Sequence, residues 1–128
     1  PAGHRLLGRR DVTPREIVRE PFLLREEGSG TRAVVEQAFR RKGLKLAPVM
    51  SLASPVAIKN LVVSGVGIAM ISRLIVEQEL RAGTLGIVAV KGLTVRRPLH
   101  RQSLAERSPS PALAKFLAVL RGLGPLPR

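Results

Sequence analysis

The order of strand-like and helix-like segments predicts an α/β fold with a mainly parallel sheet flanked by helices. Short apolar runs typical of buried strands alternate with segments in which apolar residues recur at helical spacing. Parallel strands need crossover connections, so this alternation favours helices on both faces of the sheet. In such sheets ligands bind beyond the carboxyl ends of the strands, where this chain has three polar turns, at 28–31, 51–54 and Ser72.

Short polar motifs mark where the helices begin. Thr13 and Glu16, with Pro14 between them, form a capping-box sequence, and Pro21 limits this helix to about Arg19. Ser54 and the proline after it have the form of an N-cap followed by a first helical residue. The other helices are expected over residues 31–42 with Gly43 as stop, 73–81 with Gly83 as stop, and from Ser108-Pro109 to about 121.

Apolar runs between these helices predict the strands. The run at 68–71 is continuously apolar, as expected for a strand covered on both faces. Gly65 and Gly67 precede it and are interpreted as the solution to a tight backbone turn. The other predicted strands cover residues 22–24, 48–52, 85–90 and 94–102.

Composition narrows the class of protein. The chain has 128 residues, which fits one domain or a piece of a larger one, and no apolar run long enough to predict a membrane span. Its net charge of +13 comes from scattered basic residues with only three phenylalanines and no tyrosine or tryptophan, so we favour solvated basic faces over a nucleic-acid surface. The absence of cysteine excludes a disulfide framework and is compatible with a cytoplasmic location, which we expect.

The turn Gly28-Ser29-Gly30-Thr31 is the strongest candidate for a binding site. It joins a strand-like run to a helix-like run, and a helix N-terminus offers amide donors and a positive dipole end to an anion. Ser29 and Thr31 add hydroxyl groups, although both are also ordinary turn and capping residues. Arg32 follows, and it suits either a ligand carboxylate or phosphate or an ion pair with Glu26 or Glu27.

Three further serines lie in the turns after other predicted strands. Ser51 is a candidate ligand contact, whereas Ser54 better suits an N-cap, with ligand binding as its alternative. Ser72 would lie at the edge of the same cleft or cap the next helix.

Catalysis and metal binding find no support in the sequence. His4 and His100 are far apart, without carboxylates at metal-ligand spacing, so we expect neither a metal nor a cofactor. The Gly28-Ser29-Gly30 turn lacks the spacing of a nucleophile elbow, and no acid–histidine pair completes a triad. We therefore expect a protein that is not an enzyme.

An ordered set of motifs resembles the effector-binding domain of LysR-type transcriptional regulators. The matching segments are PFLLREEGSGTR at 21–32, SPVAIK at 54–59, VVSGVGIAMIS at 62–72, RRPLH at 96–100 and the helix-like run at 110–120. The resemblance implies the second lobe of a fold similar to type 2 periplasmic binding proteins. It implies that residues 1–92 form that lobe, and that residues 93–128 return a strand and a C-terminal helix to the first lobe.

The resemblance also implies a function. It indicates an effector-sensing fragment that binds a small anionic metabolite, dimerises, and reaches DNA only through a helix-turn-helix domain that this chain lacks. The effector would contact residues in the turns described above: Gly28, Ser29, Gly30, Thr31, Arg32, Ser51, Ser54 and Ser72. Two alternatives remain, a free-standing solute- or oxyanion-binding protein and a dimerisation module without a ligand.

Overall fold

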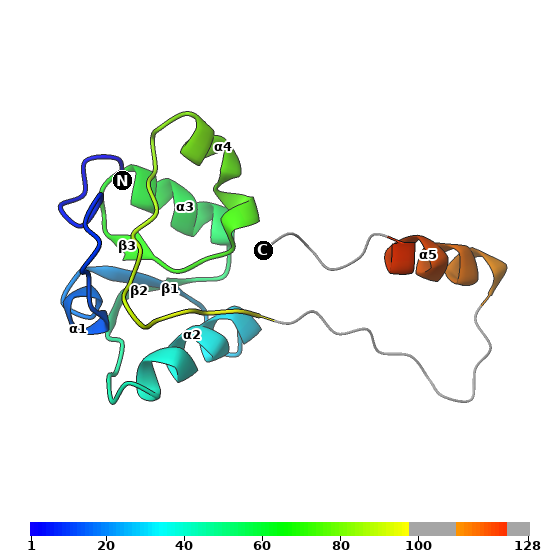
Figure 1. The fold of residues 1–128 in the computed structure, drawn as a ribbon, viewed down its shortest axis with the longest axis horizontal. Coiled ribbons are helices and arrows are strands. Elements are labelled where there is room, and N and C mark those ends of the chain that lie inside the picture. The colour runs from blue at the N-terminus through cyan, green and yellow to red at the C-terminus, as the bar shows by residue number, and fades with distance from the viewer. Residues whose placement is uncertain (98–109, 123–128) are drawn as a thin grey trace. The chain divides into compact units, whose positions relative to one another are not determined.

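The computed structural model describes residues 1–97 and 110–122 and divides into two units, Pro1–Arg97 and Pro98–Arg128. The first unit contains a three-stranded parallel sheet in the order β2-β1-β3 (Figure 1). The strands are β1 (Phe22–Arg25), β2 (Pro48–Leu52) and β3 (Ile68–Ala69). The helices are α1 (Pro14–Ile17), α2 (Gly30–Arg40), α3 (Pro55–Val63), the 3₁₀ turn η1 (Arg73–Ile75), α4 (Glu77–Arg81) and, in the second unit, α5 (Pro111–Gly122).

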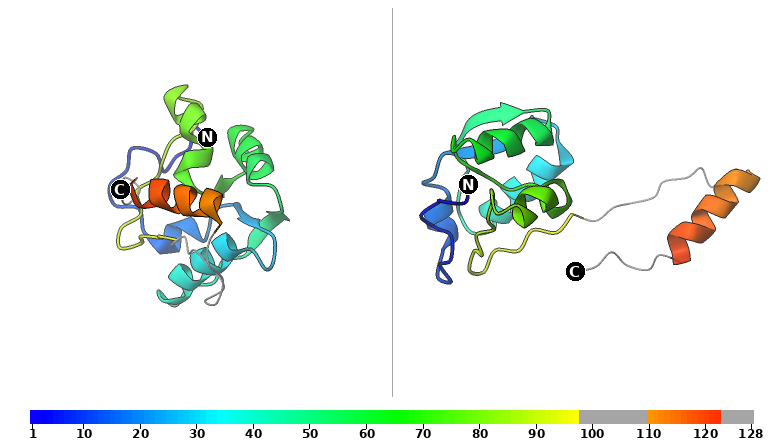
Figure 2. Two further views of the ribbon diagram at one scale, coloured as in Figure 1. Left: turned by 90° about the vertical axis from the view of Figure 1, so that its right-hand side faces the viewer. Right: turned by 90° about the horizontal axis from the view of Figure 1, so that it is seen from above.

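Alternate side chains of β1 enter two separate cores. Phe22 and Leu24 pack with Val35 and Phe39 of α2 in one cluster, where the Phe22 and Phe39 rings meet edge to face at 6.3 Å. Leu23 packs on the other face, with Ile58 of α3. Because successive strand residues point to opposite faces, α2 and α3 cover opposite sides of the sheet (Figures 1 and 2). The predicted α/β class and parallel sheet are confirmed.

The N-terminal segment completes the first core. Leu6 and Val12 are fully buried in the cluster under α2. The capping box predicted at the start of α1 is present, since the Thr13 side chain accepts from the Glu16 amide and Glu16 accepts from the Thr13 amide. The helix itself is shorter than expected, and Arg19 and Glu20 continue it only as i→i+3 turns.

Gly67 lies directly against the start of β1. The Ile68 amide donates to the Pro21 carbonyl at 2.8 Å, and a Cβ placed on Gly67 would lie 2.2 Å from that carbonyl oxygen. Gly65 has φ +79°, a conformation that side chains disfavour. Both glycines therefore have the backbone role that the sequence predicted.

The prediction for residues 68–71 was too long and too buried. The strand β3 covers Ile68–Ala69, and both residues are only partly buried. The physical reason is the position of β3 in the sheet: among the described residues it pairs with β1 alone, so it is an edge strand.

The predicted strand at 85–90 was wrong. Its burial does not alternate, since Gly86 and Ile87 are both exposed, and strand pairing needs a ladder of hydrogen bonds to a neighbour. Among the described residues its backbone bonds are isolated: the Leu85 amide donates to the Glu79 carbonyl at 3.3 Å, and the Val90 carbonyl accepts from the Leu93 amide at 3.2 Å. Just beyond its end, the Lys91 amide donates to the Val12 carbonyl at 2.7 Å. Residues 94–97 likewise form no strand, and the rest of the predicted strand at 94–102 lies outside the described residues.

Two helix predictions also need correction. The helix expected over 73–81 is divided into η1 and α4, because Val76 has φ −108° and ψ 9°, outside the α region. The predicted start of the last helix at Ser108-Pro109 lies outside the described residues. Helix α5 is described from Pro111, and the Leu113 amide donates to the Ser110 hydroxyl at 3.3 Å.

Candidate functional site

Three polar turns meet at one edge of the sheet. The strands are parallel, so the carboxyl ends of β1, β2 and β3 lie at the same edge, where Figure 1 shows the chain leaving each strand toward its next helix. The residues that the sequence predicted as ligand contacts lie in these turns, in the first turn of α2 and, for Ser51, near the end of β2. The direct contact among the predicted residues is between Arg32 and Ser51, whose Nη1 and Oγ atoms are 3.3 Å apart.

The turn after β1 presents unpaired donors. Gly28 has φ +84°, which turns the chain into α2, and Ser29 is the N-cap residue. The Ser29 hydroxyl makes no capping hydrogen bond, contrary to the capping alternative for this side chain. The first helical hydrogen bond is from the Ala33 amide to the Ser29 carbonyl at 3.0 Å. In the described part of the chain the amides of residues 30–32 therefore have no acceptor, and the first turn contains no acidic residue.

Arg32 is held firmly by its neighbours. Its Nε atom donates to Glu36 at 2.7 Å, and its Nη1 atom lies 3.3 Å from both the Arg25 carbonyl and the Ser51 hydroxyl. Its Nη2 atom is 3.6 Å from Glu27, so the predicted ion pair with Glu27 is present, while Glu26 pairs with Arg25. Arg32 thus ties the ends of β1 and β2 to α2.

Arg25 and Glu26 form a two-bond ion pair at the end of β1. Nε and Nη2 of the guanidinium each donate to a Glu26 carboxylate oxygen at 2.8 Å. The Arg25 guanidinium lowers the pKa of Glu26, and the Glu26 carboxylate raises the pKa of Arg25. This ion pair joins the last residue of β1 to the first residue of the turn.

The remaining predicted serines differ in how their hydroxyls are used. Ser54 accepts from the Ala57 amide at 3.2 Å and is therefore an N-cap of α3, as expected. Ser72 precedes η1 and makes no side-chain capping bond, so its hydroxyl does not cap the next helix. Ser51 accepts from Arg32, which leaves its own proton available as a donor.

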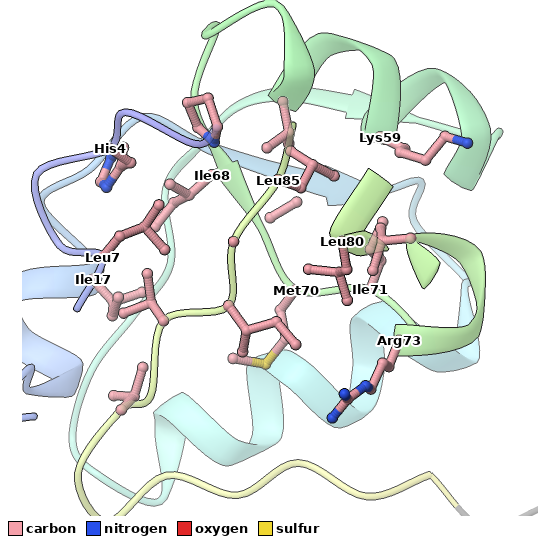
Figure 3. Close-up of a pocket in the computed structure, with 18 of the residues that line it drawn as sticks. His4, Leu7, Ile17, Lys59, Ile68, Met70, Ile71, Arg73, Leu80 and Leu85 are labelled. Atoms are coloured by element: carbon pink, nitrogen blue, oxygen red, sulfur yellow. The ribbon is translucent and has the colours of Figure 1, made fainter. Parts of the chain in front are cut away.

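A separate hollow of about 580 Å³ lies beside the edge strand β3. Its lining is mainly apolar, with Met70 from the end of β3 and Leu80 from α4 among the contributing side chains (Figure 3). Figure 3 shows His4 and Arg73 in different parts of its rim. None of the predicted contacts lines this hollow, and sequence reasoning did not find it. The sequence signal for this hollow was a pair of apolar runs, at 68–71 and 85–90, and neither run had an obvious segment to pack against.

Metal-ligand clusters and membrane-spanning helices are both absent from the described residues. Within 1–97 and 110–122, no group of three or more His, Cys, Asp or Glu side chains is arranged to hold a metal ion. Among the described helices, none is both long and apolar enough to cross a membrane.

The proteins similar to this chain include a transcriptional regulator. The chain is 38% identical over 117 residues to the HTH-type transcriptional regulator CbbR of Sinorhizobium medicae, a match that covers 91% of this chain and 37% of CbbR. It is 44% identical over 115 residues to a protein of Anaeromyxobacter dehalogenans named phosphonates import ATP-binding protein PhnC, covering 86% of this chain and 23% of that protein. The chain thus spans well under half the length of these relatives.

A solved structure supports the fold independently. The regulatory domain of Synechocystis CcmR, determined in complex with 2-PG, matches with a TM-score of 0.81 and 24% identity, over 98% of this chain and 61% of that one. The family model of the LysR substrate binding domain matches residues 1–124. The chain therefore belongs to the LysR substrate-binding domain family, as the ordered motifs predicted.

Proposed function

We propose that this chain is the effector-sensing part of a LysR-type transcriptional regulator and binds a small anionic metabolite at the start of α2. The observation that carries the proposal is the row of three amides, at residues 30–32, without acceptors in the described structure. The hydroxyls of Ser29 and Thr31 lie in the same turn. An anion accepting from these groups would complete the hydrogen bonds that the helix leaves open.

The proposed organisation follows the family. Residues 1–92 form the second lobe of the effector domain, and residues 93–128 belong to the first. The anion would lie between the lobes, and its higher affinity for one lobe arrangement would shift the orientation of attached DNA-binding domains. On this proposal the protein is cytoplasmic, acts without catalysis or cofactor, and reaches DNA through a helix-turn-helix domain outside this chain.

The test removes one amide without removing the helix. Gly30 is the first residue of α2, Ser29 before it already has the extended φ −64° and ψ 125° that a following proline requires, and a Cβ at Gly30 meets nothing within 4 Å. Gly30→Pro should therefore fold normally while it loses one donor. We expect inorganic phosphate or 2-PG to bind the wild-type chain in calorimetric titration, and Gly30→Pro to weaken binding about fivefold to tenfold.

A matched control and a contrary result make this test decisive. Ser64→Ala removes an exposed hydroxyl at the C-terminal end of α3, where it donates to the Asn60 carbonyl. This variant should bind the anion with unchanged affinity. Saturable binding that Gly30→Pro leaves intact would exclude α2 as the anion site. The absence of saturable heat from the wild-type chain with phosphate and with carboxylate and phosphate metabolites would overturn the proposed function.

One observation favours a second function, self-association. Helix α5 exposes a row of large apolar side chains, of which Phe116 and Val119 are 58% and 61% exposed. Exposed apolar surface of this kind commonly marks a protein contact, and a dimerisation module would use it. Light scattering should then report a dimer that Phe116→Ser converts to a monomer, whereas a monomeric wild-type chain would exclude this function.

A further inference from the structure

We propose that a group of basic side chains at the amino edge of the sheet, where the parallel strands begin, contacts the phosphate backbone of duplex DNA. It would add a second DNA contact to the one expected from a helix-turn-helix domain. In the sequence these cations are scattered, which favoured solvated charges, but the fold brings several of them together. We call the group the amino-edge patch, and its members are Arg40, Arg41, Lys42, Lys45 and Lys91.

The direction of α2 carries four of these cations away from the proposed anion site. The helix begins beyond the carboxyl end of β1 and runs back to the opposite edge, where the chain turns toward β2 (Figure 1). Arg40 is the last residue of α2 and Arg41 is its C-cap, while Lys42 and Lys45 follow in the connection to β2. A helix of 11 residues is about 16 Å long, so the patch is separate from the open amides at the helix start.

A turn late in the first unit lies against this end of α2. The Nζ atom of Lys42 is 3.7 Å from the point where a Cβ on Gly92 would be. Leu44, from the connection after α2, and Leu93, from the late turn, pack against the same core cluster. Lys91 directly precedes Gly92. Two segments that are far apart in the sequence therefore bring their cations to one surface.

The charge of the amino-edge patch is not neutralised within the described part of the chain. All five side chains are exposed, and none forms an ion pair or a side-chain hydrogen bond with a described residue. The sequence contains no Asp or Glu at 37–76 or at 80–105. Asp11 lies at the margin, where a hydrogen bond from Arg9 and, to a smaller extent, the charge of Lys91 lower its pKa. Because Asp11 is already paired with Arg9, it neutralises little of the patch.

The chemistry of the patch fits the backbone of a double helix. Unpaired cations bind phosphates and release the counterions condensed on them, without reading the bases. Proteins that hold single strands add aromatic side chains on which bases stack, but Phe39, the aromatic residue next to the patch, is fully buried. On the proposed function the chain is attached to a DNA-binding domain, which would hold duplex DNA at a high local concentration. The choice of DNA therefore rests on the proposed function, whereas the patch itself does not.

The experiment compares two double variants that lose the same charge. The 128-residue chain is titrated into a labelled duplex of arbitrary sequence, and fluorescence anisotropy gives the affinity at several salt concentrations. Lys42→Gln with Lys91→Gln should weaken binding about tenfold at low salt and lower the slope of log affinity against log salt by about 2. Lys42→Arg with Lys91→Arg should retain both values. Arg73→Gln with Arg81→Gln removes two exposed charges from η1 and α4 and should leave the slope unchanged.

The outcomes separate this inference from the proposed function. Equal weakening by the two glutamine pairs would indicate net charge alone and overturn the inference. It would also be overturned by a wild-type chain without salt-dependent binding to the duplex, or by tighter binding to vesicles of anionic lipid than to DNA. The patch lies about 16 Å from the open amides of α2, beyond the Debye length of about 10 Å at 0.1 M salt. Lys42→Gln with Lys91→Gln should therefore bind inorganic phosphate as the wild type does, and loss of the DNA contact alone would leave the effector function standing.

Discussion

The helices that follow β1 and β2 begin in different ways, although a serine precedes the first residue of each. At α3, Pro55 has no amide proton and the Ala57 amide is capped by Ser54. At α2, glycine stands in place of proline, and the hydroxyl of Ser29 makes no cap. Within the described residues the start of α3 therefore leaves one amide without an acceptor, that of Val56, whereas the start of α2 leaves three. The difference shows that two turns of similar sequence can leave different numbers of helix donors open, through the exchange of proline for glycine and the direction of one hydroxyl.

The largest expected effect comes from breaking the support of the open turn. Arg32→Met leaves Glu36 without its partner and removes the donor shared by the Arg25 carbonyl and Ser51. The free energy of unfolding should fall by about 2 kcal/mol in urea denaturation. Arg81→Met breaks a comparable i,i+4 pair at a 79% exposed side chain and should change stability by less than about 0.5 kcal/mol. An equal decrease in the free energy of unfolding in both variants would show that the contacts of Arg32 stabilise the fold no more than an exposed ion pair does.

A smaller effect should separate the two serines directly. Ser54→Ala removes the cap of α3 and should lower the free energy of unfolding by about 1 kcal/mol. Ser29→Ala removes a hydroxyl that makes no capping bond and should stay within about 0.5 kcal/mol of the wild type. Both values follow from urea denaturation at neutral pH. A loss of similar size at Ser29 would mean that its hydroxyl does cap α2 in solution.

The smallest effect concerns pH and the anchoring of α3. The hydrogen bond from Lys59 lowers the pKa of Glu79 below its ordinary value of 4.5. Because the folded pKa is depressed, the pair stabilises the fold fully above pH 4.5, and this contribution is lost as the pH falls through the folded pKa. Glu79→Gln should therefore reduce the acid-induced decline of the urea midpoint below about pH 4.5. Glu16 and Glu26 also have lowered pKa values, so some decline should remain, and an unchanged profile would contradict the role of the pair.

Local chemistry explains which parts of the fold the sequence could predict. The capping box at Thr13 and Glu16 and the N-cap at Ser54 depend on residues within three positions, and both are present. The strand predicted at 85–90 depended on a partner elsewhere in the chain, which an apolar run cannot supply by itself. The site divides in the same way. Its turns follow the strands at one edge as predicted, and the i,i+4 pair of Arg32 with Glu36 was a local signal that the prediction missed. The contacts of Arg32 with the Arg25 carbonyl and with Ser51 depend on the pairing of β1 with β2, which no local pattern specifies.

The close approach of Gly67 to Pro21 also sets the alignment of the sheet. A shift of β3 by one residue along β1 would bring Val66 or Ile68 to the point where even a methyl carbon would be 2.2 Å from a carbonyl oxygen. A strand pair as short as this one has few hydrogen bonds with which to resist slippage. Because only glycine fits at this point, Gly67 fixes the register of β3 against β1. It keeps the turn that contains Ser72 and Arg73 at a constant level relative to the start of α2.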